Sequence, residues 1–301
     1  MKRGLVFVLF TAVISGCAIF INQFGVKGID STVFTFSKNL VVSLLLLAII
    51  LGFREFRNLK KLGRKEWLSL IFIGFVGGSI PFILFFKGLQ LSTGAVGSFI
   101  HKSMFIFVAV LAILFLKERL SVKILVPAVL LLAGNFFLLN LASFEMTLGA
   151  FLVFMATLFW SVETVISKKV LESIQPKILA FGRLFFGSLF IMVYMAFTNK
   201  LAFIPTLSFA QLSWILISAP FLLLYVITWY TGLKEIKAAT AASVLLLGCP
   251  ITTLLSFIFL GKALTIMQAA GILLIVAGVI SMVVLSERKD FGASVRVNYG
   301  T

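Results

Sequence analysis

Few ionisable side chains lie inside the long apolar stretches of this 301-residue sequence, and those few are where chemistry could occur. Three are cations (Lys38, Lys102 and Arg183), one is an acid (Glu163), and His101 is the one histidine of the chain. A charge inside a bilayer is costly, so such a residue is read as functional unless it lies close to a helix end. These five side chains are therefore the first candidates for contact with a ligand.

Lys38 and Arg183 each lie about five residues inside an apolar stretch, which corresponds to roughly 7.5 Å of helix. At that depth a long side chain can anchor neighbouring helices or reach the headgroups, and it can equally line a cavity and hold an anionic group. Lys102 lies deeper, so reaching the headgroups explains it less well. For all three cations a structural role and a substrate-binding role remain open.

Glu163 shares one helical face with Trp160 and Ser167, because the three residues follow the spacing i, i+3 and i+7. In the functional interpretation, Glu163 binds a substrate ammonium group or carries a proton, and Trp160 lines the same site. In the structural interpretation, Glu163 forms a static ion pair with Arg183, since an unpaired buried charge costs several kcal/mol. The sequence does not decide between the two.

His101 is the side chain best suited to titrate near neutral pH, so it is a second candidate for proton coupling, although a single histidine is more often a hydrogen-bonding group. The chain also has two aspartates, Asp30 and Asp290, and two cysteines, Cys17 and Cys249, at scattered positions. A metal site or an acid–base pair is hard to assemble from these residues. We expect no metal, no cofactor and no catalytic residues.

The composition is that of a membrane protein, because 61% of the residues are hydrophobic and 12% are charged, whereas soluble domains carry about 25% charged residues. A spanning helix needs roughly 20 apolar residues. Ten stretches satisfy this requirement: 5–24, 33–53, 67–86, 95–116, 122–140, 147–167, 178–197, 212–231, 238–260 and 265–285. We predict an all-α polytopic membrane protein of ten transmembrane helices.

The run up to Cys17 resembles a lipoprotein signal, but its apolar character continues beyond Cys17 and favours an uncleaved first helix.

Glycine and proline predict breaks in two of these stretches. Gly77, Gly78 and Pro81 interrupt the third stretch, and Gly248 with Pro250 interrupts the ninth. Such breaks free backbone groups that can coordinate a solute or form hinges, whereas small residues also simply permit close helix packing. The sequence is compatible with either role.

Basic residues fix the expected orientation. One set of alternate loops, with the two ends of the chain, holds 19 of the 26 Lys and Arg residues, and the other set holds 4. Loops rich in Lys and Arg stay in the cytoplasm, so we expect both termini to be cytoplasmic. We assign the net charge of +16 to contact with anionic membrane lipid and not with nucleic acid, because no basic face with stacking aromatics is evident.

The two halves of the chain repeat one another. At an offset of 145 residues Lys38 lies over Arg183, and at an offset of 144 residues Glu118 lies over Lys262. Apolar helices often match leucine to leucine by chance, but they seldom match one embedded cation to another. Each half contains five helices, an odd number, so the second half enters the membrane from the opposite side. Such inverted repeats are typical of secondary transporters, whose substrate site lies near the midplane.

Four further residues complete the sequence-based picture of the site. Asn22 lies at the repeat position of Ser167 and continues a weak polar stripe in the first helix. Tyr225, Trp229 and Tyr230 of the eighth helix fit an aromatic belt at the membrane interface. Tyr225 lies nearest the middle of that helix, so it is the aromatic residue of this group that we expect to contact substrate.

The run Leu116-Lys117-Glu118-Arg119-Leu120-Ser121, followed by Ala133-Gly134, resembles the end of an EamA-type repeat of the drug/metabolite transporter superfamily. Gly232-Leu233-Lys234, Pro250 and the second-helix cations extend the resemblance over about residues 5–285. It implies a ten-helix transporter of small metabolites. Two departures stand out: the acidic residue at the repeat end is Glu118 in the first copy but Lys262 in the second, and Pro250 aligns with Ile106. We therefore expect the proline break once.

These observations predict a first repeat over residues 1–143, a second over 144–286 and a polar, disordered cytoplasmic tail over 287–301. The expected function is a secondary transporter of the plasma membrane that moves a small zwitterionic or anionic metabolite by alternating access. The resemblance favours export of an amino-acid-like solute. A passive channel and, less well supported, an intramembrane enzyme are the alternatives. The expected partners are the small solute and membrane lipid, and homo-oligomerisation remains open.

Overall fold

The computed structural model describes residues 3–25, 28–92, 94–118, 122–139 and 146–297. Within these ranges nine helical segments are long and apolar enough to cross a membrane, and a tenth apolar segment, Val122–Leu138, is shorter. The described part of the chain forms helices and no strands. The prediction of a polytopic all-α membrane protein is confirmed. The repeat boundary expected at 143/144 and residues 119–121 of the repeat-end motif lie outside the described residues.

The helices follow one another in two comparable series. The first half contains α1 (Arg3–Gly25), α2 (Ser31–Gly52), the short α3 (Phe56–Lys60), α4 (Arg64–Gly78), α5 (Ile80–Gln90), α6 (Gly94–Lys102), α7 (Met104–Leu116), η1 (Val122–Ile124) and α8 (Leu125–Leu138). The second half contains α9 (Leu148–Val170), α10 (Pro176–Phe197), η2 (Lys200–Phe203), α11 (Phe209–Glu235), α12 (Ala238–Val244), η3 (Leu245–Leu247), α13 (Gly248–Leu260) and α14 (Ile266–Val297).

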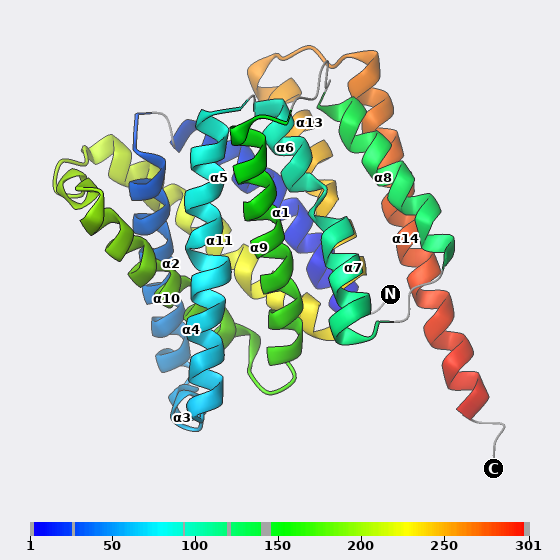
Figure 1. Cartoon of the computed structure of the whole chain (residues 1–301), viewed down its shortest axis with the longest axis horizontal. Helices are drawn as coiled ribbons and strands as arrows, with labels where there is room; N and C mark the ends of the chain where they lie inside the picture. The colour runs from blue at the N-terminus through cyan, green and yellow to red at the C-terminus, as the bar shows by residue number, and fades with distance from the viewer. Residues whose placement is uncertain (1–2, 26–27, 93, 119–121, 140–145, 298–301) are drawn as a thin grey trace.

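The two halves run in opposite directions (Figure 1). We call the end of the bundle that holds the start of α1, the short helix α3 and the end of α14 the base, and the opposite end the top. Helix α1 runs from base to top, whereas α9, the first helix of the second half, runs from top to base. This arrangement is the one that the odd helix count of each half predicts.

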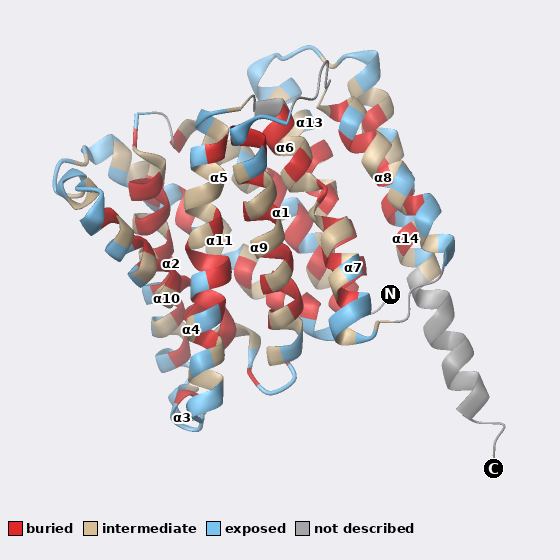
Figure 2. Cartoon of the chain, viewed as in Figure 1, coloured by how far each residue is buried: buried red, intermediate tan, exposed pale blue. Residues whose placement is uncertain are grey.

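At the centre of the bundle, helices of each half pack against helices of the other half. Helix α1 packs along α11 and α13 of the second half, and α9 packs along α5 and α7 of the first half. At the two edges, α8 pairs with α14 and α2 pairs with α10 (Figure 1). Buried residues follow the facing sides of the central helices, and exposed residues gather at the helix ends and outer faces (Figure 2). The first helix of each repeat thus lies between elements of the other repeat.

The helix breaks agree with the prediction in the third and ninth crossings. The third is interrupted at Ser79, between α4 and α5, and the ninth by the 3₁₀ turn η3 before Gly248. The fourth crossing is also interrupted, at Ser103, which the 144-residue offset places over Leu247. The Ser103 hydroxyl donates to the Phe99 carbonyl at 2.9 Å, a local bond that bends helices without proline. The sequence predicted that the break of the ninth crossing has no counterpart in the first half, and this expectation is wrong.

The last helix is longer than the sequence predicts. Helix α14 continues to Val297, so the expectation of a disordered tail from residue 287 is wrong for residues 287–297. The segment after 285 is polar, which ends the apolar stretch, but it contains no proline. Polarity therefore ends the membrane-spanning part without ending the helix, because Glu, Arg and Lys are good helix formers. Residues 298–301 lie outside the described residues.

Asp30 connects the two halves at the top. Its Oδ1 accepts hydrogen bonds from the backbone N–H groups of Thr32 (2.8 Å) and Val33 (3.2 Å), and its Oδ2 accepts one from Lys200 Nζ at 2.7 Å. Partial burial acts to raise the pKa of Asp30, but the Lys200 ammonium and the two N–H groups outweigh it, so the pKa lies below its ordinary value of 3.8. The stabilisation is present above that value and is lost as the pH falls through the lower folded-state pKa.

We predict that Asp30→Ala lowers the melting temperature of the purified protein at pH 7 more than Asp30→Asn does. Asparagine still caps α2, which contributes about 1 kcal/mol, and loses only the ion pair with Lys200. Thermal unfolding in detergent measures both effects. The difference between wild type and Asp30→Asn should shrink as the pH falls through the folded-state pKa. A difference that persists unchanged there would contradict the ion-pair contribution.

Candidate functional site

Glu163 is almost completely buried, at 2% exposed, on the middle part of α9. Its Oε1 accepts hydrogen bonds from the Ser167 hydroxyl at 2.6 Å and from the Tyr230 hydroxyl at 2.7 Å. Its Oε2 lies 3.9 Å from Nη2 of Arg183. A buried carboxylate is tolerated only when donors and an opposite charge replace its hydration. Residues from three helices, α9, α10 and α11, supply them here.

Arg183 completes the same arrangement from α10. Its Nη1 donates to the Tyr230 hydroxyl at 3.2 Å, and its Nη2 donates to the Gly77 carbonyl at 3.3 Å. Its guanidinium carbon also lies 6.0 Å from the centre of the Tyr230 ring. Tyr230 therefore accepts from the cation and donates to Glu163. We call Glu163, Arg183, Tyr230, Ser167 and Gly77 the buried charge cluster.

The break in the third crossing gives Arg183 its backbone acceptor. Proline has no N–H group, so Pro81 cannot donate to the carbonyl four residues earlier, which belongs to Gly77. That carbonyl accepts instead from Trp160 Nε1 at 3.1 Å and from Arg183. A Cβ atom at Gly77 would overlap the side chain of Glu163, and one at Gly78 would lie against the Arg183 backbone. Gly77 and Gly78 both allow close helix packing, and Gly77 in addition exposes its carbonyl to side-chain donors.

Several other predicted residues lie apart from the buried charge cluster. The His101 ring packs 4.7 Å from Trp160 and 5.2 Å from Phe85, and its buried Nδ1 has no hydrogen-bond partner among the described residues. Lys102, next to the Ser103 break, lies near the Cys249 thiol.

The remaining predicted residues have varied surroundings. Lys38 is half-buried and lies over the Phe34 ring at 4.7 Å. Tyr225 stacks on Trp229 with 6.4 Å between the ring centres, and Asn22 is half-buried in α1. Pro250 is buried in the first turn of α13. None of these side chains hydrogen-bonds to the buried charge cluster in the described structure.

Sequence reasoning missed Tyr230. It was expected in the interfacial belt with Trp229, yet the two are 0% and 2% exposed, so the belt assignment is wrong for both. A usable signal exists in the sequence. Glu163 is the one embedded acid and needs donors, and Tyr230 is a hydroxyl residue at a similar distance from the base end of its helix. The sequence alone does not show that α9 and α11 bring the two side chains together.

A second polar arrangement closes the base. Lys168 Nζ donates to the carbonyls of Leu233 (2.8 Å), Lys234 (3.0 Å) and Ile236 (2.8 Å) at the end of α11. Glu118 accepts from the backbone N–H groups of Ala238 at 2.7 Å and, weakly, Ala239 at 3.5 Å at the start of α12. The Lys168 ammonium thus lies at the C-terminus of α11 and the Glu118 carboxylate at the N-terminus of α12, and the helix dipole stabilises a charge of each sign at these ends. We call Lys168, Glu118 and the α11–α12 turn the base clasp.

The repeat positions at the top cannot form the same clasp. The counterpart of Lys168 at offset 145 is Gln23, and the counterpart of Glu118 at offset 144 is Lys262. The buried Nε2 of Gln23 has no hydrogen-bond partner among the described residues, and Lys262 is exposed. A cation at a helix N-terminus would also oppose the helix dipole. The two ends of the bundle are therefore held by different interactions.

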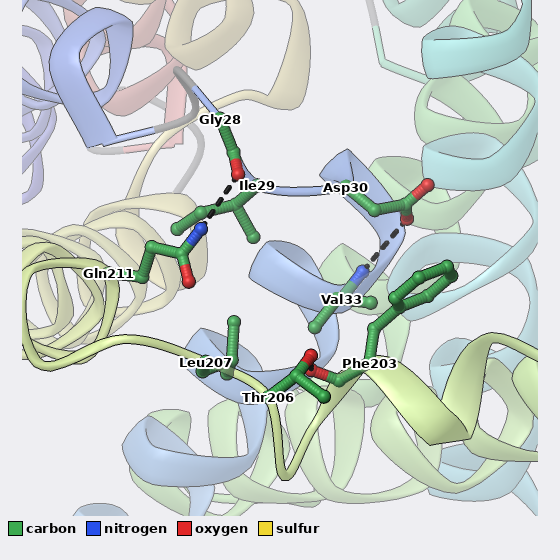
Figure 3. A pocket seen from close by; sticks show the side chains of 8 residues that line it. All are labelled: Gly28, Ile29, Asp30, Val33, Phe203, Thr206, Leu207 and Gln211. Carbon is green, nitrogen blue, oxygen red and sulfur yellow. Dashed lines mark hydrogen bonds between the residues drawn. The ribbon is translucent and has the colours of Figure 1, made fainter.

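A pocket of about 310 Å³ lies at the top, away from the predicted site residues. It is lined by Gly28, Ile29, Asp30, Val33, Phe203, Thr206, Leu207 and Gln211 (Figure 3). Both carboxylate oxygens of Asp30 are already used, and Gln211 Nε2 donates to the Gly28 carbonyl at 2.7 Å. The polar groups at this pocket join the segment before α2 to α11 and η2, and none of the residues predicted to bind substrate lines it.

The fold and the buried charge cluster define a class: a polytopic α-helical membrane protein built from two repeats around an internal polar site. Comparison with known protein families identifies the family within this class. The model of the EamA-like transporter family matches residues 2–140 and again residues 147–284. The chain belongs to the EamA-like transporter family, and the predicted resemblance is confirmed.

Three related proteins are each designated an uncharacterized transporter. An uncharacterized transporter of Clostridium kluyveri is 24% identical over 296 residues, which cover 92% of each chain. One of Methanothermobacter thermautotrophicus is 25% identical over 73% of this chain, a match that spans only 65% of that relative's length. The uncharacterized transporter YyaM of Bacillus subtilis is 24% identical over 77% of this chain. A crystal structure 18% identical in sequence superposes with a TM-score of 0.77 over 96% of this chain and 99% of its own, which supports the fold.

We predict that Gly77→Ala destabilises the protein, because its methyl group has no space beside Glu163. Overpacking of this kind costs about 1–3 kcal/mol. Gly52→Ala is the matched control, since a Cβ atom at Gly52 meets no neighbour within 4 Å. Thermal unfolding of both variants in the same detergent measures the difference. Equal melting temperatures would show that the α4–α9 contact is looser than described.

Proposed function

We propose that this chain is a secondary transporter of the plasma membrane that exports a small zwitterionic or anionic, amino-acid-like metabolite by alternating access. The observation that carries the proposal is the buried charge cluster beside a broken helix within two inverted repeats. Charged groups inside a membrane-spanning bundle are expensive and serve solute pathways. Broken helices at the interface of inverted repeats form the solute sites of secondary transporters.

Two further breaks support this location. Ser103 and η3 interrupt the fourth and ninth crossings at equivalent repeat positions. Lys102 and Cys249 flank these breaks. The proposed solute pathway therefore passes between the two halves, with Lys38, Lys102 and Arg183 as its cations. Glu163 and His101 are the residues that we propose for proton coupling where coupling is present.

The base clasp supports alternating access. We place the base in the cytoplasm, because most Lys and Arg residues lie in the connections at that end. In the described conformation Lys168 and Glu118 hold the α11–α12 turn against α9 and the end of α7. Release of this turn would open the cytoplasmic side. The repeat positions at the top do not form this clasp, although the Asp30–Lys200 ion pair joins the two halves there. We therefore propose, from the base clasp, that the described state is the one closed toward the cytoplasm.

We predict that Lys168→Met and Glu118→Gln shift the protein toward the state open at the base. A charge-assisted hydrogen bond contributes roughly 1.5–3 kcal/mol, so the population should change by about tenfold or more. Spin-label distances between the α7–α8 connection and the α11–α12 turn, in a background with Cys17 and Cys249 replaced, measure this change. Lys169→Met is the control, because Lys169 is exposed and pairs with Glu172 alone among the described residues. Unchanged distances would contradict the clasp.

The purified protein in liposomes tests the function itself. We expect saturable uptake of radiolabelled amino or organic acids, with counterflow when unlabelled solute is present inside. Linear, unsaturated flux would instead indicate a channel, and chemical conversion without flux would indicate an enzyme. If Glu163 carries protons, Glu163→Gln should change the pH profile of uptake. An unchanged profile would leave Glu163 with the structural role of pairing with Arg183.

A further inference from the structure

The membrane-spanning part of the bundle holds more positive than negative charge. It contains three cations, Lys38, Lys102 and Arg183, but one carboxylate, that of Glu163. This carboxylate already interacts with Arg183 and with the hydroxyls of Tyr230 and Ser167. It is therefore not available to neutralise a second cation, nor to bind the ammonium group of a solute.

The repeat shows which partners Lys38 lacks. Lys38 is the counterpart of Arg183 at offset 145. The side-chain partners of Arg183 are Glu163 and Tyr230, and their counterparts in the first half are Ala18 at offset 145 and Phe86 at offset 144. Where the second half supplies a carboxylate and a hydroxyl, the first half supplies a methyl group and an unsubstituted ring. Lys38 thus keeps the position of Arg183 without its counter-ion.

The surroundings of Lys38 agree with this comparison. Among the described residues the ammonium contacts the ring of Phe34 and has no hydrogen bond or ion pair. Phe34 is 1% exposed, and its ring lies beside Gly25 of α1, 3.3 Å from where a Cβ atom would be. Lys38 itself is half-buried, so protein atoms replace part of the hydration of its ammonium. An aromatic face attracts a cation but carries no net charge, so the position remains uncompensated.

We propose, on the basis of the transport function above, that Lys38 binds the oxyanion group of the transported solute, a carboxylate or a phosphate monoester, in place of the absent counter-ion. The substrate class is then small organic anions. The embedded excess of positive charge disfavours cations, and the engagement of Glu163 leaves no carboxylate for an ammonium group. In the second half the protein supplies the counter-ion itself, so the two embedded cations have different roles.

The test uses probes of matched size and different charge. Succinate, succinamide and putrescine share a four-carbon chain and are anionic, neutral and cationic, respectively. Glycerol 3-phosphate is compared with uncharged glycerol as the phosphate probe. Thermal stabilisation of the purified full-length protein, in detergent without anionic lipid, measures binding. We expect stabilisation by the anionic members, and the carboxylate and phosphate arms decide which oxyanion is preferred. Stabilisation by the neutral or cationic members alone, or by none, would overturn the proposal.

Four variants assign the effect to Lys38. Lys38→Gln should weaken anion binding by about tenfold or more, the loss expected for one charge-assisted contact, and Lys38→Arg should restore most of it. Ala18→Glu places a carboxylate at the counterpart of Glu163 and should compete with the solute, whereas Ala18→Gln adds the same volume without charge and should weaken binding less. All four are compared only as monodisperse protein. Unchanged affinity in Lys38→Gln would overturn the proposal.

Failure of this proposal and failure of the transport function give different results. Anions that stabilise the protein through Lys38 but show no flux in liposomes would leave the binding site intact and refute transport. Saturable flux of a neutral or cationic solute, unaffected by Lys38→Gln, would support transport and refute the anion site.

Discussion

A carboxylate buried at 2% exposure in a membrane-spanning bundle is the constraint on which the rest of the site depends. Water cannot solvate Glu163, so protein groups must do so. This requirement brings together Ser167 from its own helix, Tyr230 from α11 and Arg183 from α10. It also requires a glycine at position 77, where any side chain would collide with Glu163. One charge thus fixes the relative placement of four helices, α4, α9, α10 and α11.

The same requirement for partners explains the broken helices. A helix break in a bilayer is costly because it frees backbone groups that have no water to bind. Pro81 frees the Gly77 carbonyl, and the guanidinium of Arg183 and the indole of Trp160 bind it. The break and the cation therefore satisfy each other, and neither would be favourable alone. At the base, Lys168 and Glu118 apply this principle to helix ends, where the free groups are the last carbonyls of α11 and the first N–H groups of α12.

Much of the fold follows from the sequence because hydrophobic length and charge distribution act along the chain. The ten crossings, the repeat and the breaks at Gly78–Pro81 and before Pro250 are all local signals. The break at Ser103 was missed because a serine hydroxyl bonding back to Phe99 has no distinctive sequence pattern. Tyr230 was missed for another reason: its partner Glu163 lies on a different helix, 67 residues away. The pairing of Glu163 with Arg183 was one of two open interpretations, and only the helix arrangement shows the 3.9 Å approach.

The divergence of the two repeats now acquires a physical meaning. Under the proposed alternating access, a perfectly symmetric pair of inverted halves would make the base-closed and top-closed states equal in free energy, so neither would be preferred. Here the base has a clasp of four well-formed charge-assisted hydrogen bonds, and the top has Gln23 and Lys262 in the corresponding positions. The top is held instead by the Asp30–Lys200 ion pair, so different contacts would stabilise the two closed states of the proposed mechanism. A solute that neutralises an embedded cation changes the free energy of the states unequally, since it stabilises most the state in which it is bound most tightly. In the proposed mechanism, asymmetry at the two ends would make the two closed states unequal in free energy. The uncompensated charge of Lys38 would then give the solute an electrostatic means of shifting the balance between them.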